Sequence, residues 1–188
     1  MSTRRDFLLA ASASAALLAM SGSKVGASEE GTAMTKQQQQ AMTPAKALAE
    51  LKAGNERFVA GTPRAGDLMA QVQQTASGQY PFASILGCMD SRVPPELVFD
   101  QGIGDIFAAR IAGNFTDVDL TGSLEFSTKV AGSKLILVLG HSQCGAVRGA
   151  IDGVKMGNLT ATLSHIMPAV EAVRRVEGSG KKNSAEFL

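Results

Sequence analysis

Three side chains of the kind that bind metal ions follow two apolar segments of the sequence. Cys88 comes directly after residues 82–87, and His141 and Cys144 come directly after residues 134–140. Zinc accepts thiolate sulfur and imidazole nitrogen in a tetrahedral arrangement, and a catalytic zinc keeps its fourth position open for water. The set of Cys, His and Cys therefore predicts a site for one Zn²⁺ per chain.

A disulfide between Cys88 and Cys144 is the alternative interpretation. These are the two cysteines of the chain, and a cysteine pair in an exported protein is by default a candidate disulfide. A disulfide gives no role to His141, whereas zinc binding uses all three residues. The spacing of the residues alone leaves both interpretations open.

Asp90 and Arg92 follow Cys88 at a short distance in the sequence. The carboxylate of Asp90 can occupy the fourth zinc position, or it can pair with the guanidinium of Arg92, whose planar fork matches a carboxylate. The alternative is structural: Asp90 or Ser91 caps a helix that starts near Pro94, and Arg92 forms an ordinary surface ion pair. The pattern alone does not decide between these roles.

The elements that must position these residues are short apolar strands separated by helical segments. Residues 82–86, 105–111 and 134–139 are expected to be strands, and the first and last of them to be buried on both faces. Strands that alternate with helices predict an α/β fold, a mostly parallel β-sheet flanked by α-helices. The carboxyl ends of parallel strands lie at one edge of the sheet, where ligand sites form. Cys88, His141 and Cys144 are thus expected to converge there.

Helices are predicted on both sides of these strands. Thr43 and Pro44 suit the N-cap and first position of a helix that runs to about residue 60. Further helices are expected over residues 120–130, 146–151 and, despite Pro168, 159–176. His165 falls on the last of these and is expected to be a surface or packing residue rather than a ligand.

Composition bounds the class of protein. The 188 residues suit one folded unit, with 45% apolar and 19% charged residues. The net charge of +1 and the lack of a clustered Lys/Arg stripe exclude nucleic acid and anionic lipid as expected partners.

The N-terminal segment resembles an export signal. Arg4 and Arg5 precede an apolar run over residues 7–20 that is short for a membrane span, and small residues at 25–27 suit cleavage. We expect a twin-arginine-like signal peptide at 1–27 and a periplasmic or secreted protein with no stable membrane insertion after cleavage; an uncleaved anchor is the alternative. Residues 28–42, which include four consecutive glutamines, are expected to form a disordered linker before a zinc domain at 43–188.

Two motifs carry a resemblance to a known family. The pattern Cys-x-Asp-Ser-Arg at 88–92, followed by His-x-x-Cys-Gly at 141–145, resembles the paired signature of β-class carbonic anhydrases. Further matches lie at residues 54–58, 99–105, 110–114 and 122–125, so that the resemblance covers about residues 43–173. Members of that family usually continue beyond the point where this chain ends, so the C-terminal part of the family fold is expected to be missing.

The resemblance implies a function and a role for each residue. Cys88, His141 and Cys144 would be the zinc ligands, Asp90 and Arg92 a catalytic dyad with Asp90 able to bind the metal, and the reaction the reversible hydration of carbon dioxide to bicarbonate and a proton. It also implies a homodimer or higher homo-oligomer. Two other functions compete: a catalytically silent zinc- or bicarbonate-binding protein on the same fold, and a thiol enzyme with a cysteine nucleophile and His141 as its base.

Overall fold

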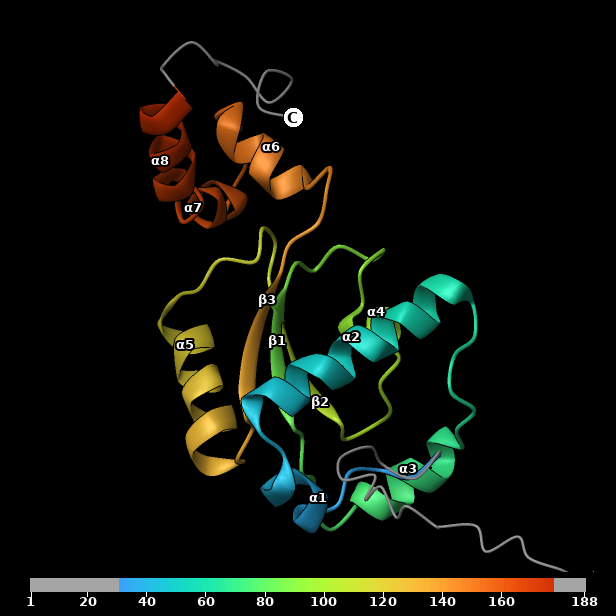
Figure 1. Ribbon diagram of the computed structural model, residues 1–188. Coiled ribbons are helices and arrows are strands. Elements are labelled where there is room, and N and C mark those ends of the chain that lie inside the picture. Colours follow the sequence, from blue (N-terminus) through green and yellow to red (C-terminus); the bar gives the residue numbers. More distant parts are fainter. Residues whose placement is uncertain (1–30, 178–188) are drawn as a thin grey trace, which may run out of the picture.

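A three-stranded parallel sheet forms the centre of the computed structural model, which describes residues 31–177 (Figure 1). The strand order is β2-β1-β3, and the strands are β1 (Ala83–Gly87), β2 (Ile106–Arg110) and β3 (Leu135–Leu139). Ala83 lies opposite both Ile106 and Leu135, and Gly87 lies opposite both Arg110 and Leu139. The three strands therefore end side by side, and the α/β fold expected from the sequence is confirmed.

Helices cover both faces of this sheet. Ala83 and Ile85 pack against α2 (Pro44–Ala60) at Ala47 and Leu51. Ser84 Oγ bonds over 2.7 Å to the hydroxyl of Ser127, in the turn that follows α5 (Val118–Glu125). Successive strand residues point to opposite faces, so α2 lies on one face and α5 on the other. The helical elements are α1 (Lys36–Ala41), α2 (Pro44–Ala60), α3 (Leu68–Thr75), α4 (Pro95–Val98), α5 (Val118–Glu125), the π-helical turn η1 (Phe126–Val130), α6 (Gly145–Ile151), α7 (Leu159–Ser164) and α8 (Met167–Glu177).

The ends of the predicted helices are explained by capping residues and prolines in the sequence. Thr43 is the N-cap of α2, its side chain accepts the N–H of Lys46, and the helix stops at Gly61, whose φ of 68° is left-handed. The single helix expected over residues 159–176 is instead two, α7 and α8. Pro168 lacks an N–H and cannot continue α7, but it fits the first turn of a new helix.

The prediction of a disordered linker is wrong for residues 31–42. The segment contains α1, capped by Thr35 in a capping box with Gln38, and Met34 and Met42 are buried in the core beside α2. Gln39 is also buried, and its side-chain amide donates to the carbonyl oxygens of Pro81 and Ala131. The segment has no regular pattern of apolar residues, so the sequence did not indicate that it is folded. It is held in place by three separate side chains, those of Met34, Gln39 and Met42. Residues 28–30, and the predicted signal peptide at 1–27, lie outside the described residues.

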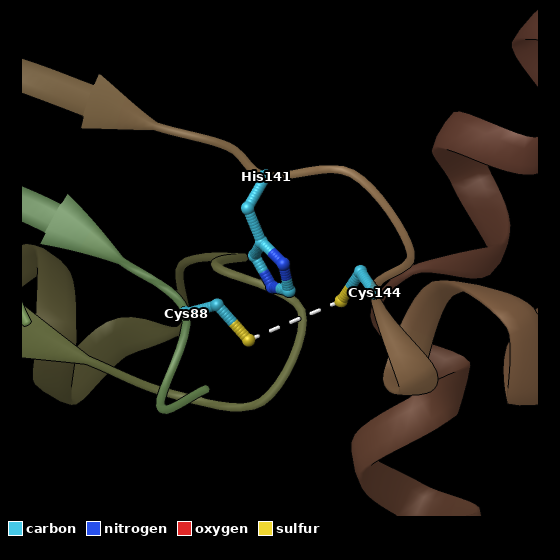
Figure 2. A group of neighbouring side chains, drawn as sticks. All are labelled: Cys88, His141 and Cys144. Atoms are coloured by element: carbon cyan, nitrogen blue, oxygen red, sulfur yellow. Dashed lines mark hydrogen bonds between the residues drawn. The ribbon is translucent and has the colours of Figure 1, made fainter. Parts of the chain in front are cut away.

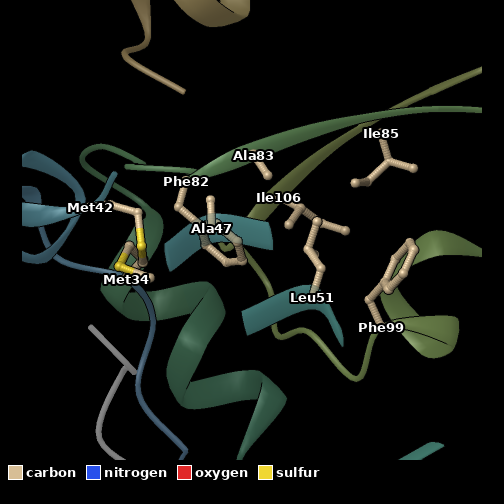
Figure 3. Packing of buried hydrophobic residues seen from close by; sticks show 9 residues of the cluster. All are labelled: Met34, Met42, Ala47, Leu51, Phe82, Ala83, Ile85, Phe99 and Ile106. Atoms are coloured by element: carbon tan, nitrogen blue, oxygen red, sulfur yellow. The ribbon is translucent and has the colours of Figure 1, made fainter. Parts of the chain in front are cut away.

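Two hydrophobic clusters are present in the described chain. The larger one lies between α2 and the sheet, around Leu51, Phe82 and Ile85, which are fully buried (Figure 3). The smaller one joins α6, α7 and α8 through residues such as Ile151, Leu163 and Val170. These three helices lie beyond the carboxyl ends of the strands (Figure 1), so they stand next to the loops that carry Cys88 and His141.

Strand β3 is not buried on both faces as predicted. Leu135, Leu137 and Leu139 pack against the α2 side, but Ile136 and Val138 point the other way and are 43% and 62% exposed. β3 is an edge strand in the described sheet, and α5 does not cover these two side chains. None of the helices among the described residues is both long and apolar enough to span a membrane.

Candidate metal centre

The loops that leave β1 and β3 bring three ligand-type side chains together. Cys88 directly follows β1, and His141 and Cys144 belong to the turn that joins β3 to α6. Because β1 and β3 are neighbours and Gly87 pairs with Leu139, the two loops emerge next to each other. Figure 2 shows the three side chains pointing toward one another.

The donor atoms of this group are close enough to share one metal ion. One ligand atom from each of Cys88, His141 and Cys144 lies within 4.8 Å of the others. The sulfurs of Cys88 and Cys144 are 3.9 Å apart and both cysteines are free, whereas a disulfide needs about 2.05 Å. The structure therefore holds two buried thiols and not the disulfide that the sequence left open.

His141 presents an unused nitrogen to the two sulfurs. Its Nδ1 lies 2.9 Å from the carbonyl oxygen of Ser142, and a proton on Nδ1 donated to that oxygen leaves the lone pair on Nε2. The side chain is 8% exposed, and Nε2 is buried with no hydrogen-bond partner among the described residues. A buried polar atom without a partner is costly. A metal ion bound at Nε2 would satisfy it, so the residues fit a metal site.

Cys88 is poised to ionise. Burial opposes ionisation of the thiol, but hydrogen bonds outweigh it. The N–H of Gly113 donates to Sγ over 3.3 Å, and the proximity of the His141 ring, the backbone N–H of Asp90 and the thiol of Cys144 add smaller effects. Together they lower the pKa of Cys88 to about 7. Since the thiolate is the form that binds metal, Cys88 is suited to be the first anionic ligand of a metal ion.

Cys144 behaves differently because it lies next to Cys88. Burial raises the pKa of the Cys144 thiol, the backbone N–H groups of Val147 and Ala146 offset part of this, and the Cys88 neighbour raises it again. Two thiolates at 3.9 Å repel each other strongly in a buried site. A cation between them removes that repulsion, which is the second reason that the site fits a metal ion.

Asp90 and Arg92 form a close pair at the rim of the group. Arg92 donates from Nε to Oδ1 over 2.9 Å and from Nη2 to Oδ2 over 2.8 Å. These bonds, with one from the backbone N–H of Arg92, hold the pKa of Asp90 well below its usual range. The alternative helix-capping role is absent in the described chain, since α4 begins after Pro94 without a side-chain cap bond. Asp90 does not belong to the group of three metal donors, although its Oδ2 lies 3.9 Å from Nε2 of His141.

Two further residues, Arg110 and Gly113, contact this group although their types and spacing alone do not predict a role. Arg110, at the end of β2, donates from its side chain to the carbonyl oxygens of Cys88 and Asp90, and Gly113 donates to the Cys88 sulfur. Both lie in residues 110–114, one of the stretches that resemble the family named in the sequence analysis. That resemblance was the one indication in the sequence that these residues belong to the site. His165 is outside the metal group, as expected: its ring stacks on Phe115 with centroids 4.7 Å apart.

Residues 83–187 match the sequence profile of a family described as carbonic anhydrase. The chain belongs to the carbonic anhydrase family. Carbonic anhydrase 2 of Mycobacterium tuberculosis is 44% identical over 131 residues, which cover 69% of this chain and 62% of that protein. The chain thus spans less than two thirds of this relative's length.

Solved carbonic anhydrases of the β class share the fold. The β-carbonic anhydrase of Coccomyxa, solved with acetazolamide, aligns with a TM-score of 0.55 and 25% identity over 76% of this chain and 60% of its own. A tetrameric β-carbonic anhydrase of Sordaria macrospora aligns with a TM-score of 0.51 and 25% identity over 73% of this chain and 70% of its own. The family resemblance noted from the motifs at 88–92 and 141–145 is therefore confirmed.

Proposed function

We propose that this carbonic anhydrase family member binds one zinc ion through Cys88, His141 and Cys144 and hydrates carbon dioxide reversibly to bicarbonate and a proton. The observation that carries the proposal is the unpartnered Nε2 of His141, which faces two buried thiols within 4.8 Å. Sulfur and imidazole donors with three protein ligands are the composition of a catalytic zinc site. The names of the relatives support the reaction at the level of the family.

The three ligands have separate tasks. Cys88, with a pKa of about 7, supplies a thiolate near neutral pH, and Cys144 supplies the second thiolate once a cation is present. The Nδ1 bond of His141 to Ser142 fixes the ring so that Nε2 faces the metal position. When bound, zinc acts as a Lewis acid that lowers the pKa of a water molecule toward about 7 and makes it a nucleophile at neutral pH.

Asp90 and Arg92 supply the orienting polar groups. The low pKa of Asp90 keeps the carboxylate ionised, so it can only accept a hydrogen bond. An acceptor at this place would orient the attacking water toward carbon dioxide. Arg92 occupies both carboxylate oxygens and thereby holds Asp90 off the metal; direct binding of Asp90 to zinc would close the fourth position.

Zinc content and carbon dioxide hydration test this proposal together. We expect about one zinc per chain in purified protein and hydration that a stopped-flow pH-indicator assay detects. His141→Ala should abolish both, and His165→Ala, which changes the other histidine of the sequence, should preserve both. Zinc without hydration would instead support a silent binding protein, and activity of metal-free protein that thiol alkylation removes would support a thiol enzyme.

The proposed assembly is a homodimer or a higher homo-oligomer. The tetrameric relative of Sordaria macrospora supports it, as do the exposed apolar side chains Ile136 and Val138 on β3. Light scattering on the purified protein should give at least twice the mass of one chain, which is 19.5 kDa before any cleavage of the signal. A mass of one chain at micromolar concentration would contradict this proposal.

Export is proposed from the sequence alone. Arg4 and Arg5 before the apolar run support a periplasmic or secreted location, and a twin-arginine route would carry the folded, zinc-loaded protein. Replacement of both arginines by lysine should retain the protein in the cytoplasm of a bacterial host. An unchanged distribution between cell fractions would contradict the proposed route.

A further inference from the structure

Arg110 contacts the backbone of the turn that carries two of the site residues. It is the last residue of β2, and its partly buried side chain reaches across to the loop that leaves β1. Nε donates to the carbonyl oxygen of Cys88 over 3.0 Å, and Nη2 donates to the carbonyl oxygen of Asp90 over 2.7 Å. One guanidinium therefore holds the peptide groups of a metal ligand and of the acid beside it.

This contact needs the shape of a guanidinium. Its donors lie in one rigid plane and can bind two acceptors at once, whereas a lysine has a single nitrogen on a flexible chain. The two acceptors belong to Cys88, whose sulfur is one of the three candidate donors, and to Asp90, whose carboxylate lies at the rim of the group. A hydrogen bond to each carbonyl oxygen restrains the peptide group that follows the residue, and so limits the backbone movement that would displace the sulfur and the carboxylate.

The backbone that follows β2 holds only the first part of the turn, and within the turn itself the N–H of Val93 donates to the carbonyl oxygen of Asp90 over 3.2 Å. Ile111 donates to the carbonyl oxygen of Gly87 over 3.1 Å and accepts from the N–H of Met89 over 3.2 Å, while Gly113 donates to the Cys88 sulfur. None of these recorded bonds from residues 111–113 reaches Asp90. The side chain of Arg110 provides the bond that links the end of β2 to Asp90.

We infer that Arg110 is a positioning residue of this site: its guanidinium, bound to the carbonyl oxygens of Cys88 and Asp90, sets the geometry of the first thiolate ligand and of the Asp90 carboxylate. The inference rests on the proposed zinc site. Arg110 does not touch the reacting atoms. It acts through the backbone, as partners behind metal ligands commonly do.

The test compares Arg110→Met and Arg110→Lys with a control, Arg64→Met. Arg64 is also partly buried and bonds to a carboxylate, that of Glu50, but it lies outside the metal group. Loss of a partner behind a metal ligand typically weakens metal affinity or activity by about 10–100-fold. We therefore expect Arg110→Met to raise the zinc dissociation constant, measured by competition with a chromophoric chelator, by about 10–100-fold. Arg110→Lys should show a smaller increase, because one nitrogen can replace one of the two bonds.

Cobalt substitution separates positioning from general destabilisation. In folded Arg110→Met protein, the sulfur-to-cobalt and visible absorption bands should shift, while Arg64→Met should lower the melting temperature and keep the wild-type bands and zinc affinity. In active preparations, kcat should fall more than KM rises. Wild-type zinc affinity and cobalt bands in Arg110→Met would overturn the inference. Zinc-loaded wild-type protein without hydration would overturn the proposed activity alone, since the metal measurements on Arg110 do not depend on it.

Discussion

Arg92 grips the carboxylate of Asp90 by both oxygens, with Nε 2.9 Å from Oδ1 and Nη2 2.8 Å from Oδ2. The same carboxylate lies 3.9 Å from the unpartnered Nε2 of His141. Asp90 is thus within reach of the metal donors but turned toward Arg92. Two of the bonds to its carboxylate come from this one side chain and one comes from the backbone N–H of Arg92, so a change of the side chain should be visible at a bound metal ion.

Arg92→Ala should free Asp90 to bind the metal and close the site. We expect zinc content to remain near one per chain and carbon dioxide hydration to fall on the order of 100-fold, the size of effect that a misplaced active-site group can have. In the cobalt-loaded variant, added azide should no longer shift the visible spectrum, because no exchangeable position remains. Adding Asp90→Asn should restore the azide response. Full hydration by zinc-loaded Arg92→Ala would contradict the role given to Arg92.

The thiol of Cys88 should react at lower pH than an ordinary cysteine once metal is removed. The thiolate is the reactive form, and the pKa of Cys88 is about 7. In metal-free Cys144→Ala protein, which keeps the Gly113 bond but loses the smaller effect of the Cys144 thiol, the rate of alkylation by iodoacetamide should therefore rise with pH through a midpoint below that of the unfolded protein. The same protein in urea should have a midpoint near the usual value of about 8.5, and zinc should protect wild-type Cys88. Equal midpoints in folded and unfolded protein would show that the hydrogen bond from Gly113 has no such effect.

The convergence of Cys88, His141 and Cys144 was predictable because it follows from two local patterns. Apolar runs that end in glycine mark strands, and parallel neighbours end at one edge of the sheet, so the residues after β1 and β3 had to meet. The choice between thiols and a disulfide was not predictable from spacing. It depends on a sulfur separation of 3.9 Å that the loop conformations determine.

Features that depend on distant contacts were missed. The linker prediction failed at residues 31–42 because Gln39 finds its partners at Pro81 and Ala131, far away in sequence. The exposure of Val138 depends on which elements cover the edge strand, and a continuous apolar run cannot reveal that. The bonds of Arg110 also join residues 20 or more positions apart. The sequence therefore shows that Arg110 lies in a stretch that resembles the family, but it does not show which residues Arg110 contacts.

Two glycine substitutions in helices should have opposite effects on stability. Gly54 of α2 is buried against the end of α4, and a Cβ there would lie 1.7 Å from the carbonyl oxygen of Phe99. Gly54→Ala must push the two helices apart, so we expect a loss of about 3 kcal/mol or more in the free energy of unfolding. Gly122 of α5 faces open space, and Gly122→Ala should gain up to about 1 kcal/mol from helix propensity.

Urea unfolding followed by circular dichroism measures both changes. The two variants add the same methyl group to a helical glycine, so both gain the helix propensity of alanine. If the free energy of unfolding falls in Gly54→Ala and rises in Gly122→Ala, the loss comes from the close approach of α2 to Phe99. This approach matters for the site because α4 continues directly from the turn that holds Asp90 and Arg92. Gly54→Ala should therefore also weaken zinc binding. Equal stability of the Gly54→Ala and Gly122→Ala proteins would show that α2 and α4 do not pack as described.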